Sequence, residues 1–443
     1  MYKRYFNEKM ETISLKELKG IQEKKLRRQV EYVYRNSRFY KEKFKMAGLR
    51  PRDIRTIDDL QKLPFTEKDE LRESQARNPP LGDHACVSLE KVIRVHSSSG
   101  TTGTPSFVGI TEHDREVWNR ITARSIYTET VRPKDIVIHA AGLTFFVGGL
   151  PVKDAIEYIG ATFVPIGTGA SDRVVSTTRL MKANVLHCTP SYVMYLANYM
   201  REKLSLEPSD LGLEKIISGA EPGVGIPGVR KKIEEDYEAD IREGLGNSDM
   251  APIIFGECEE KKGMHFCAQE FIIPELIDPK TGETIEFEDN ARGELVYTAI
   301  DRECVPLLRF RTRDHVVTWT EDCECGRSSF RLRCVGRTDD MLIVLGVNVF
   351  PSAVKDVLAS VRPKTTGEIQ ILLDKPPPRV EPPLKIKVEY SKSFKKDLKE
   401  LKREIEEEIR SKLVFKADVQ LVPEGTLPRY EMKAKYVKKL YEE

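Results

Sequence analysis

A run of serine, threonine and glycine at residues 97–104, followed by Pro105, has the composition of a phosphate-binding loop. Alternating apolar residues predict a strand on each side of it, at 92–95 and 107–110. Such a loop offers backbone N–H and hydroxyl donors that can surround phosphate oxygens. No Gly-Lys-Ser/Thr follows, so it is not a standard nucleotide P-loop. A flexible linker is the alternative, but linkers rarely join two short strands, and we expect phosphate binding.

A second set of residues has the chemistry of a metal site. Cys258 and His265 are separated by six residues, and Cys323 and Cys325 form a Cys-x-Cys-Gly turn. Three thiolates and one imidazole make a closed tetrahedral zinc site, which leaves no open position for catalysis. The alternative is a buried free thiol at Cys258 and an unrelated cysteine pair in a loop. The Cys-x-Cys-Gly turn favours structural zinc, with Cys267 as a spare ligand.

Most of the elements that would position these groups alternate between strand and helix. From about 90 to 245 this alternation predicts a largely parallel sheet covered by helices. Strands dominate from 264 to 319, which predicts a more antiparallel region. Upstream, residues 15–46 form a charged amphipathic pattern that predicts a helix broken near Asn36.

After Arg337 the pattern changes again, with helices predicted at 351–360, 394–412 and 433–441 between short strands. The fold class we expect is α/β, with a large N-terminal body at 1–336 that holds mixed sheets covered by helices. A small, mobile α+β domain at 337–443 would follow it.

Composition excludes several classes of function. The 443 residues hold 72 basic and 70 acidic side chains, so a net charge of +2 gives no electrostatic basis for nucleic-acid binding. The longest apolar region, 136–152, contains a histidine, glycines and a proline and predicts a buried strand and loop rather than a membrane span. The N-terminus lacks the apolar core of a signal peptide. With eight cysteines expected to be reduced, we predict a cytoplasmic protein.

Several motifs in order along the chain resemble the phenylacetate–CoA ligases, within the adenylate-forming superfamily of acyl-CoA synthetases and luciferases. The matching segments are residues 34–40, 63–68 (Leu-Pro-Phe-Thr-Glu-Lys), 97–104, 189–192 (Thr-Pro-Ser-Tyr), 219–222 (Gly-Ala-Glu-Pro), 311–314 (Arg-Thr-Arg-Asp) and 336–351. The resemblance implies an AMP-forming carboxylate–CoA ligase. Mg·ATP would convert the acid to an acyl-adenylate, CoA thiol would then displace AMP, and the small domain would rotate between the two half-reactions.

The resemblance assigns the ATP phosphates to the serine- and glycine-rich loop. Many relatives carry a lysine after its last glycine, where this chain has Thr104, so the phosphates would bind less tightly unless another cation substitutes. The loop residues implied in this contact are Ser98, Ser99, Gly100, Thr101, Thr102, Gly103 and Thr104.

Four further residues match catalytic or nucleotide-binding positions. Asp314 would accept hydrogen bonds from the ribose hydroxyls, and Arg337 would contact ribose or phosphate. Asp339 matches the hinge. Lys433 matches the lysine that meets the carboxylate and α-phosphate, although Met432 replaces the usual glycine. The alternatives are a surface salt bridge for the aspartate and an ordinary basic terminal helix for the lysine.

Two segments would form the rest of the site. Leu245 and Asp249 stand where relatives carry a tyrosine that stacks on adenine and a glutamate that binds Mg²⁺, and aspartate also suits that cation. The loop after the expected strand 214–218 would line the adenine and acyl sites through Gly219, Ala220, Glu221 and Pro222.

Phe145 and Phe146 would provide an aromatic surface for the acyl group, with core packing as the alternative. Since nearby positions differ from the relatives, phenylacetate itself is not implied, and the expected acid is an aryl or a short branched or hydroxy acid. The partners implied are this acid, ATP and CoA, without nucleic acid or membrane and with a homodimer left open. The competing functions are an adenylyltransferase that leaves AMP on another acceptor and a non-catalytic homologue.

Overall fold

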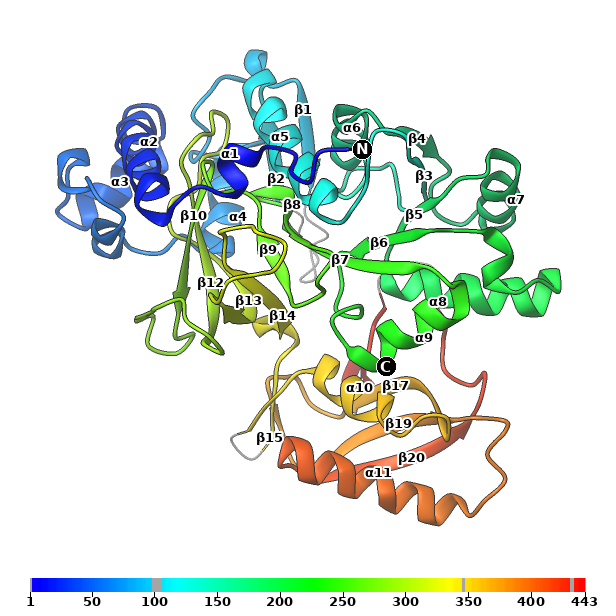
Figure 1. Ribbon diagram of the computed structural model, residues 1–443. Helices are drawn as coiled ribbons and strands as arrows, with labels where there is room; N and C mark the ends of the chain where they lie inside the picture. The colour runs from blue at the N-terminus through cyan, green and yellow to red at the C-terminus, as the bar shows by residue number, and fades with distance from the viewer. Residues whose placement is uncertain (1, 98–105, 345–346, 431–433, 443) are drawn as a thin grey trace.

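The computed structural model describes residues 2–97, 106–344, 347–430 and 434–442. A large body forms the upper part of the molecule in Figure 1, and a small domain lies beneath it. The phosphate-loop residues 98–104 and Lys433 lie outside the described residues, and so does the side chain of Asp339. The two-part α/β architecture expected from the sequence is confirmed.

A mixed sheet of twelve strands forms the centre of the body, in the order β11-β10-β12-β13-β14-β9-β8-β7-β6-β5-β3-β4. The run from β4 to β7 is parallel, and the remaining neighbours are antiparallel, as the change of pattern along the sequence predicts. The parallel strands are β3 (Ile136–His139), β4 (Thr162–Pro165), β5 (Val185–Cys188), β6 (Lys215–Gly219) and β7 (Asp240–Asn247). The antiparallel strands are β8 (Ala251–Glu257), β9 (Met264–Phe266), β10 (Ile272–Ile277), β11 (Thr284–Ile285), β12 (Arg292–Ala299), β13 (Phe310–Trp319) and β14 (Arg331–Arg337).

Helices cover both faces of the parallel strands because successive side chains of a strand point to opposite faces. Val137, Val185 and Ile217 pack under α5 and α6. Their neighbours Ile138 and Leu186 pack under the helices of the other face. The first layer consists of α5 (Glu112–Thr128) and α6 (Leu150–Ile159), and the second of α7 (Ser171–Met181), α8 (Pro190–Tyr199) with its π-helical extension (Met200–Leu204), and α9 (Pro227–Tyr237).

The N-terminal quarter packs on the antiparallel half of the body. The predicted long helix is broken at Ser37, which caps the second helix through its side chain. A two-stranded hairpin frames the phosphate loop, although its first strand begins at Arg94 rather than at residue 92. These elements are α1 (Glu8–Glu11), α2 (Leu15–Asn36), α3 (Arg38–Met46), α4 (Lys68–Arg77), β1 (Arg94–Ser97) and β2 (Phe107–Ile110).

The small domain has its own apolar core, between a four-stranded sheet ordered β20-β19-β17-β21 and its helices. A 3₁₀ turn at Thr338–Asp340 connects it to β14, and a three-stranded sheet β16-β15-β18 lies beyond that turn. The elements are β15 (Leu342–Val344), β16 (Val347–Val349), α10 (Pro351–Ala359), β17 (Thr365–Leu373), β18 (Arg379–Val380), β19 (Leu384–Tyr390), α11 (Leu398–Leu413), β20 (Ala417–Pro423) and β21 (Val437–Lys439).

The helix predicted at 433–441 is wrong. Among the described residues of that segment, Val437–Lys439 form β21, which pairs in parallel with β17, and a 3₁₀ turn follows. A helix of nine residues has little stability of its own, and the hydrogen bonds offered by the edge of β17 outweigh its propensity.

Within the described residues, none of the helices combines the length and apolar character needed to cross a membrane.

Candidate functional site

The phosphate loop begins beside the loop that carries the two phenylalanines. The Ser97 N–H donates to the carbonyl oxygen of Phe145 at 3.0 Å, and His96 Nδ1 lies 3.2 Å from the same oxygen. The rings of Phe145 and Phe107 are 5.8 Å apart, so the aromatic loop also contacts the strand that leaves the phosphate loop. Phe145 and Phe146 are 46% and 47% exposed, which excludes core packing for both. An acyl-binding role for them stays a prediction.

Asp314 and Arg337 lie opposite each other on β13 and β14. Arg337 Nη1 donates to Asp314 Oδ1 at 2.8 Å, and Asp314 is almost fully buried. The Asp314 N–H is held by Thr312 Oγ1 at 3.0 Å. The structure therefore brings together the two residues that were predicted to bind ribose, at the end of β14 where the chain leaves the body.

The Gly-Ala-Glu-Pro loop follows β6 and turns sharply. A Cβ on Gly219 would lie 2.3 Å from the carbonyl oxygen of Gly244 on β7, so only glycine fits this close approach. Ala220 has φ of +71°, in the left-handed region that non-glycine residues rarely adopt. Such strain is concentrated at functional sites, in keeping with a binding role for this loop.

Glu221, the third residue of this loop, connects the body to the C-terminal segment. Its Oε1 accepts the Ser191 N–H at 2.7 Å, and its Oε2 accepts the Ala434 N–H at 2.7 Å. Ala434 directly follows Lys433, so the predicted catalytic lysine is next in sequence to a residue that contacts the Gly-Ala-Glu-Pro loop. Tyr436, two residues further on, accepts a hydrogen bond from the buried amine of Lys355 at 2.9 Å.

Asp249 lies in the turn between β7 and β8, and its carboxylate pairs with Lys68 at 2.5 Å. Arg302 Nη1 donates to the main-chain oxygens of both Asp249 and Met250 at 2.7 Å. Leu245, on β7, packs partly buried against the core of the body. In the sequence Lys68 appears only as part of the Leu-Pro-Phe-Thr-Glu-Lys motif. Its ion pair with Asp249 could not be predicted, because the two residues are 181 positions apart.

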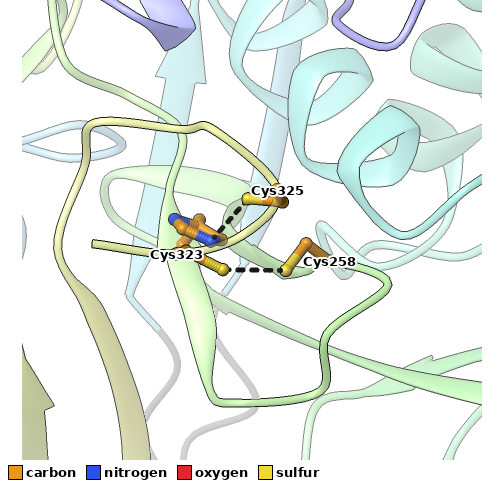
Figure 2. Close-up of side chains that lie close together, drawn as sticks. Cys258, Cys323 and Cys325 are labelled. Carbon is orange, nitrogen blue, oxygen red and sulfur yellow. Dashed lines mark hydrogen bonds between the residues drawn. The ribbon is translucent and has the colours of Figure 1, made fainter. Parts of the chain in front are cut away.

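The predicted zinc ligands come together in one buried cluster. The ligand atoms of Cys258, His265, Cys323 and Cys325 all lie within 4.8 Å of one another (Figure 2). The sulfurs of Cys258 and Cys323 are 3.7 Å apart, and Cys325 Sγ lies 3.2 Å from His265 Nε2. A tetrahedron with Zn–S bonds of ~2.3 Å has S–S edges of about 3.8 Å, and disulfides are far shorter.

Groups around the cluster also suit a metal. His265 Nδ1 lies 3.1 Å from the carbonyl oxygen of Ser329, so this nitrogen can carry the proton and leave Nε2 as the ligand. All four ligand residues are buried. Cys267 lies outside the cluster and its thiol instead donates to the carbonyl oxygen of His265. The residues therefore fit a closed zinc site.

The N-terminal segment packs directly on the loop that carries Cys323 and Cys325. Tyr5 Oη donates to the carbonyl oxygen of Cys325 at 3.0 Å. Arg327 Nε donates to Glu11 Oε2 at 2.9 Å, and only 2% of each of these two side chains is exposed. The Ser328 N–H donates to the carbonyl oxygen of Glu11 at 2.9 Å. The loop that carries Cys323 and Cys325 and the short helix α1 thus form a single corner of the body.

Comparisons with known proteins agree on one class of enzyme. Residues 346–440 match the family described as AMP-binding enzyme C-terminal domain. Phenylacetate-coenzyme A ligase of Thermus thermophilus is 36% identical over 419 residues, which are 94% of this chain and 89% of that protein.

Crystal structures of 2-hydroxyisobutyryl-CoA ligase are similar over nearly the whole chain, but to a different degree in different states. In the postadenylation state with 2-HIB-AMP, the TM-score is 0.92 at 30% identity, covering 99% of this chain and 93% of that one. In the thioesterification state with 2-HIB-AMP and CoA, the TM-score falls to 0.73 at 30% identity, covering 99% and 92%. The domains of this chain therefore have the relative arrangement of the postadenylation state.

Proposed function

The chain belongs to the phenylacetate–CoA ligase family of adenylate-forming enzymes, and we propose that it joins an aryl or short hydroxy carboxylic acid to CoA through an acyl-adenylate. The observation that carries this proposal is the full-length similarity to ligases of such acids. In the first half-reaction a carboxylate oxygen attacks the α-phosphorus of ATP and pyrophosphate leaves. In the second the CoA thiol attacks the mixed anhydride, and a thioester and AMP form.

The residues act mainly by binding and by balancing charge. Asp314 accepts hydrogen bonds from the ribose hydroxyls. Arg337, whose Nη1 donates to Asp314 Oδ1 at 2.8 Å, contacts the ribose or the phosphates. Lys433 lowers the repulsion between the carboxylate and the α-phosphate. The loop from Ser98 to Thr104 binds the phosphates with N–H and hydroxyl donors.

Lys68 is the cation that can compensate for Thr104. Its amine lies against Asp249, and α4, which begins at Lys68, is bonded to Phe107 through Gln75. Phe107 opens the strand that follows the phosphate loop. When bound, Mg²⁺ would supply positive charge to the phosphates through Asp249, whose carboxylate oxygens suit this cation. We propose that Lys68 contributes to the same charge balance.

The acid is an open part of the proposal, and the two exposed phenylalanines beside the phosphate loop favour an apolar acyl group. The cluster of three cysteines and one histidine is proposed to hold structural zinc. The hinge at Asp339, the domain boundary at 336/337, the cytoplasmic location and the homodimer stay predictions.

The test is release of pyrophosphate and AMP across a panel of aryl, hydroxy and short branched acids, each with and without CoA. CoA-dependent turnover that yields a thioester identifies the ligase and its acid. Adenylation whose rate and products are independent of CoA would favour an adenylyltransferase. Absence of exchange between ATP and pyrophosphate with every acid would favour a non-catalytic homologue.

A further inference from the structure

We propose that Glu221 is a positioning residue that holds the small domain in its present arrangement, which is that of the postadenylation state, and must release it before thioester formation. The inference rests on the proposed function, since it concerns the order of the two half-reactions. It gives Glu221 a role different from the lining of the acyl or adenine site.

The carboxylate of Glu221 bridges two parts of the molecule that belong to different domains. One oxygen accepts the N–H of Ser191, in the first turn of α8 in the body, and the other accepts the N–H of Ala434. Glu221 is 7% exposed, so these hydrogen bonds are made largely out of water, where a charged acceptor binds an N–H strongly.

The segment that Glu221 holds is attached to the small domain. The Ile371 N–H on β17 donates to the carbonyl oxygen of Tyr436 at 2.7 Å, and Lys355 of α10 donates to the Tyr436 hydroxyl. Residues 437–439 then join the small-domain sheet as β21. A rotation of the small domain would therefore carry Ala434 away from Glu221.

A second contact is specific to the same arrangement. A Cβ on Gly228, in the first turn of α9, would lie only 2.7 Å from the Cβ of Ala359 at the end of α10. Neither group has a flexible end that could move aside, so the body and the small domain can approach this closely only because residue 228 is glycine. Figure 1 shows α9 on the lower side of the body, above α10 of the small domain.

These two contacts can be broken independently and by small changes. In Glu221→Gln one of the two acceptor oxygens becomes an NH₂ group, which cannot accept either N–H. In Gly228→Ala the added methyl favours the helical conformation of α9 in the body but collides with Ala359. The double variant Gly228→Ala/Ala359→Gly removes the collision and keeps the added methyl. Glu235→Gln, which neutralises an exposed carboxylate on α9, is the matched control.

The two half-reactions are measured separately, as exchange between ATP and pyrophosphate and as thioester formation from CoA and supplied synthetic acyl-adenylate. We expect Glu221→Gln and Gly228→Ala to slow the exchange at least about tenfold, while thioester formation stays within about twofold. The double variant is expected to regain the exchange, and Glu235→Gln to match the wild type. If Glu221→Gln slows both half-reactions equally, the carboxylate acts on the bound adenylate and the proposal is wrong. Full exchange in Gly228→Ala also contradicts it.

A structural readout separates this inference from the proposed function. Spin labels on Glu157→Cys in the body and Lys375→Cys in the small domain, both at exposed positions, report the distance between the domains without any substrate. We expect the distance of the present arrangement to be populated in the wild type and depleted in Glu221→Gln and Gly228→Ala. An unchanged distance distribution overturns the proposal, even if the chain has no ligase activity.

Discussion

The contact between the body and the small domain differs in kind from the corner where the N-terminal segment meets the loop that carries Cys323 and Cys325. The first includes the hydrogen bond from the Ala434 N–H to Glu221 and the close approach of Gly228 to Ala359. The second contains four potential metal ligands and the buried ion pair of Arg327 with Glu11. If the small domain rotates as proposed, its contact with the body relies on a hydrogen bond and small residues, whereas the N-terminal corner contains buried charges and the candidate metal ligands.

Energetics explain this division. One hydrogen bond contributes about 1 kcal/mol, or about 1.5–3 kcal/mol when one partner is charged. Removing one partner of a buried ion pair costs about 3–5 kcal/mol, because the other charge stays buried alone. Only the free energy of a single hydrogen bond is small enough for a contact between domains to be broken and remade repeatedly.

The largest effect is expected at the metal-binding corner. Cys325→Ser should abolish zinc binding and lower the free energy of unfolding by about 5 kcal/mol, since metal binding contributes directly to folding. Zinc content and thermal unfolding are the measurements, with Cys334→Ser as the control that keeps its zinc. Full zinc occupancy in Cys325→Ser would refute the site and would remove one side of the comparison.

Lys433→Ala should act on the first half-reaction without affecting the fold. We expect adenylation to fall by about 10²–10³-fold, the range seen when one charge-stabilising group is removed. Thioester formation from supplied acyl-adenylate should remain, because the lysine is assigned to the first half-reaction alone. Lys435→Ala, which changes an exposed neighbour, is the control. Equal loss of both half-reactions in a folded variant would contradict the assignment.

Glu11→Gln tests whether the buried ion pair makes the N-terminal corner permanent. We expect the free energy of unfolding to fall by about 3 kcal/mol, because Arg327 would keep only its longer contact with Glu259, at 3.9 Å. The matched change, Glu42→Gln, breaks the exposed pair with Arg38 and should cost less than about 0.5 kcal/mol. Urea denaturation measures both, and similar values for the two variants would show that burial does not distinguish these pairs.

The smallest effect is expected from pH at the connection between the domains. His315 Nε2 lies 2.8 Å from Thr338 Oγ1, and the ring packs on Phe350. Burial lowers the pKa of His315 from 6.5, the nearby charge of Glu294 raises it, and that of Arg311 lowers it further. A histidine with a lowered pKa stabilises the structure while neutral, and this contribution is lost as the pH falls below about 6.5.

Adenylation should therefore decline relative to thioester formation by about threefold between pH 7 and 5.5. A pKa shift of one full unit corresponds to about 1.4 kcal/mol, or a factor of about ten, so the expected decline is smaller than that. In His315→Gln the ratio of the two half-reactions should become flat, whereas His113→Gln, at an exposed site on α5, should keep the wild-type profile. A pH-dependent ratio that persists in His315→Gln would assign the effect to another group.

Local patterns made much of the site predictable. Asp314 and Arg337 lie in short motifs, and the Cys-x-Cys-Gly turn contains half of the metal ligands. The bond from Ala434 to Glu221 could not be predicted, because its donor is a main-chain N–H 213 positions away and main-chain donors look alike in every sequence. Likewise, β21 depends on a neighbouring strand rather than on its own residues, and the helix predicted there was wrong.

The pairing of Glu11 with Arg327 also determines when the body can be completed during synthesis. The two residues are 316 positions apart. At 5–20 residues per second, a ribosome needs roughly 16–60 s to add the arginine after the glutamate. Throughout this interval the acidic side chain of the first helix has no buried partner, and the loop that closes is among the longest in the chain. Residues around Glu11 are thus among the last of the body to find their native positions, although they are synthesised long before Arg327.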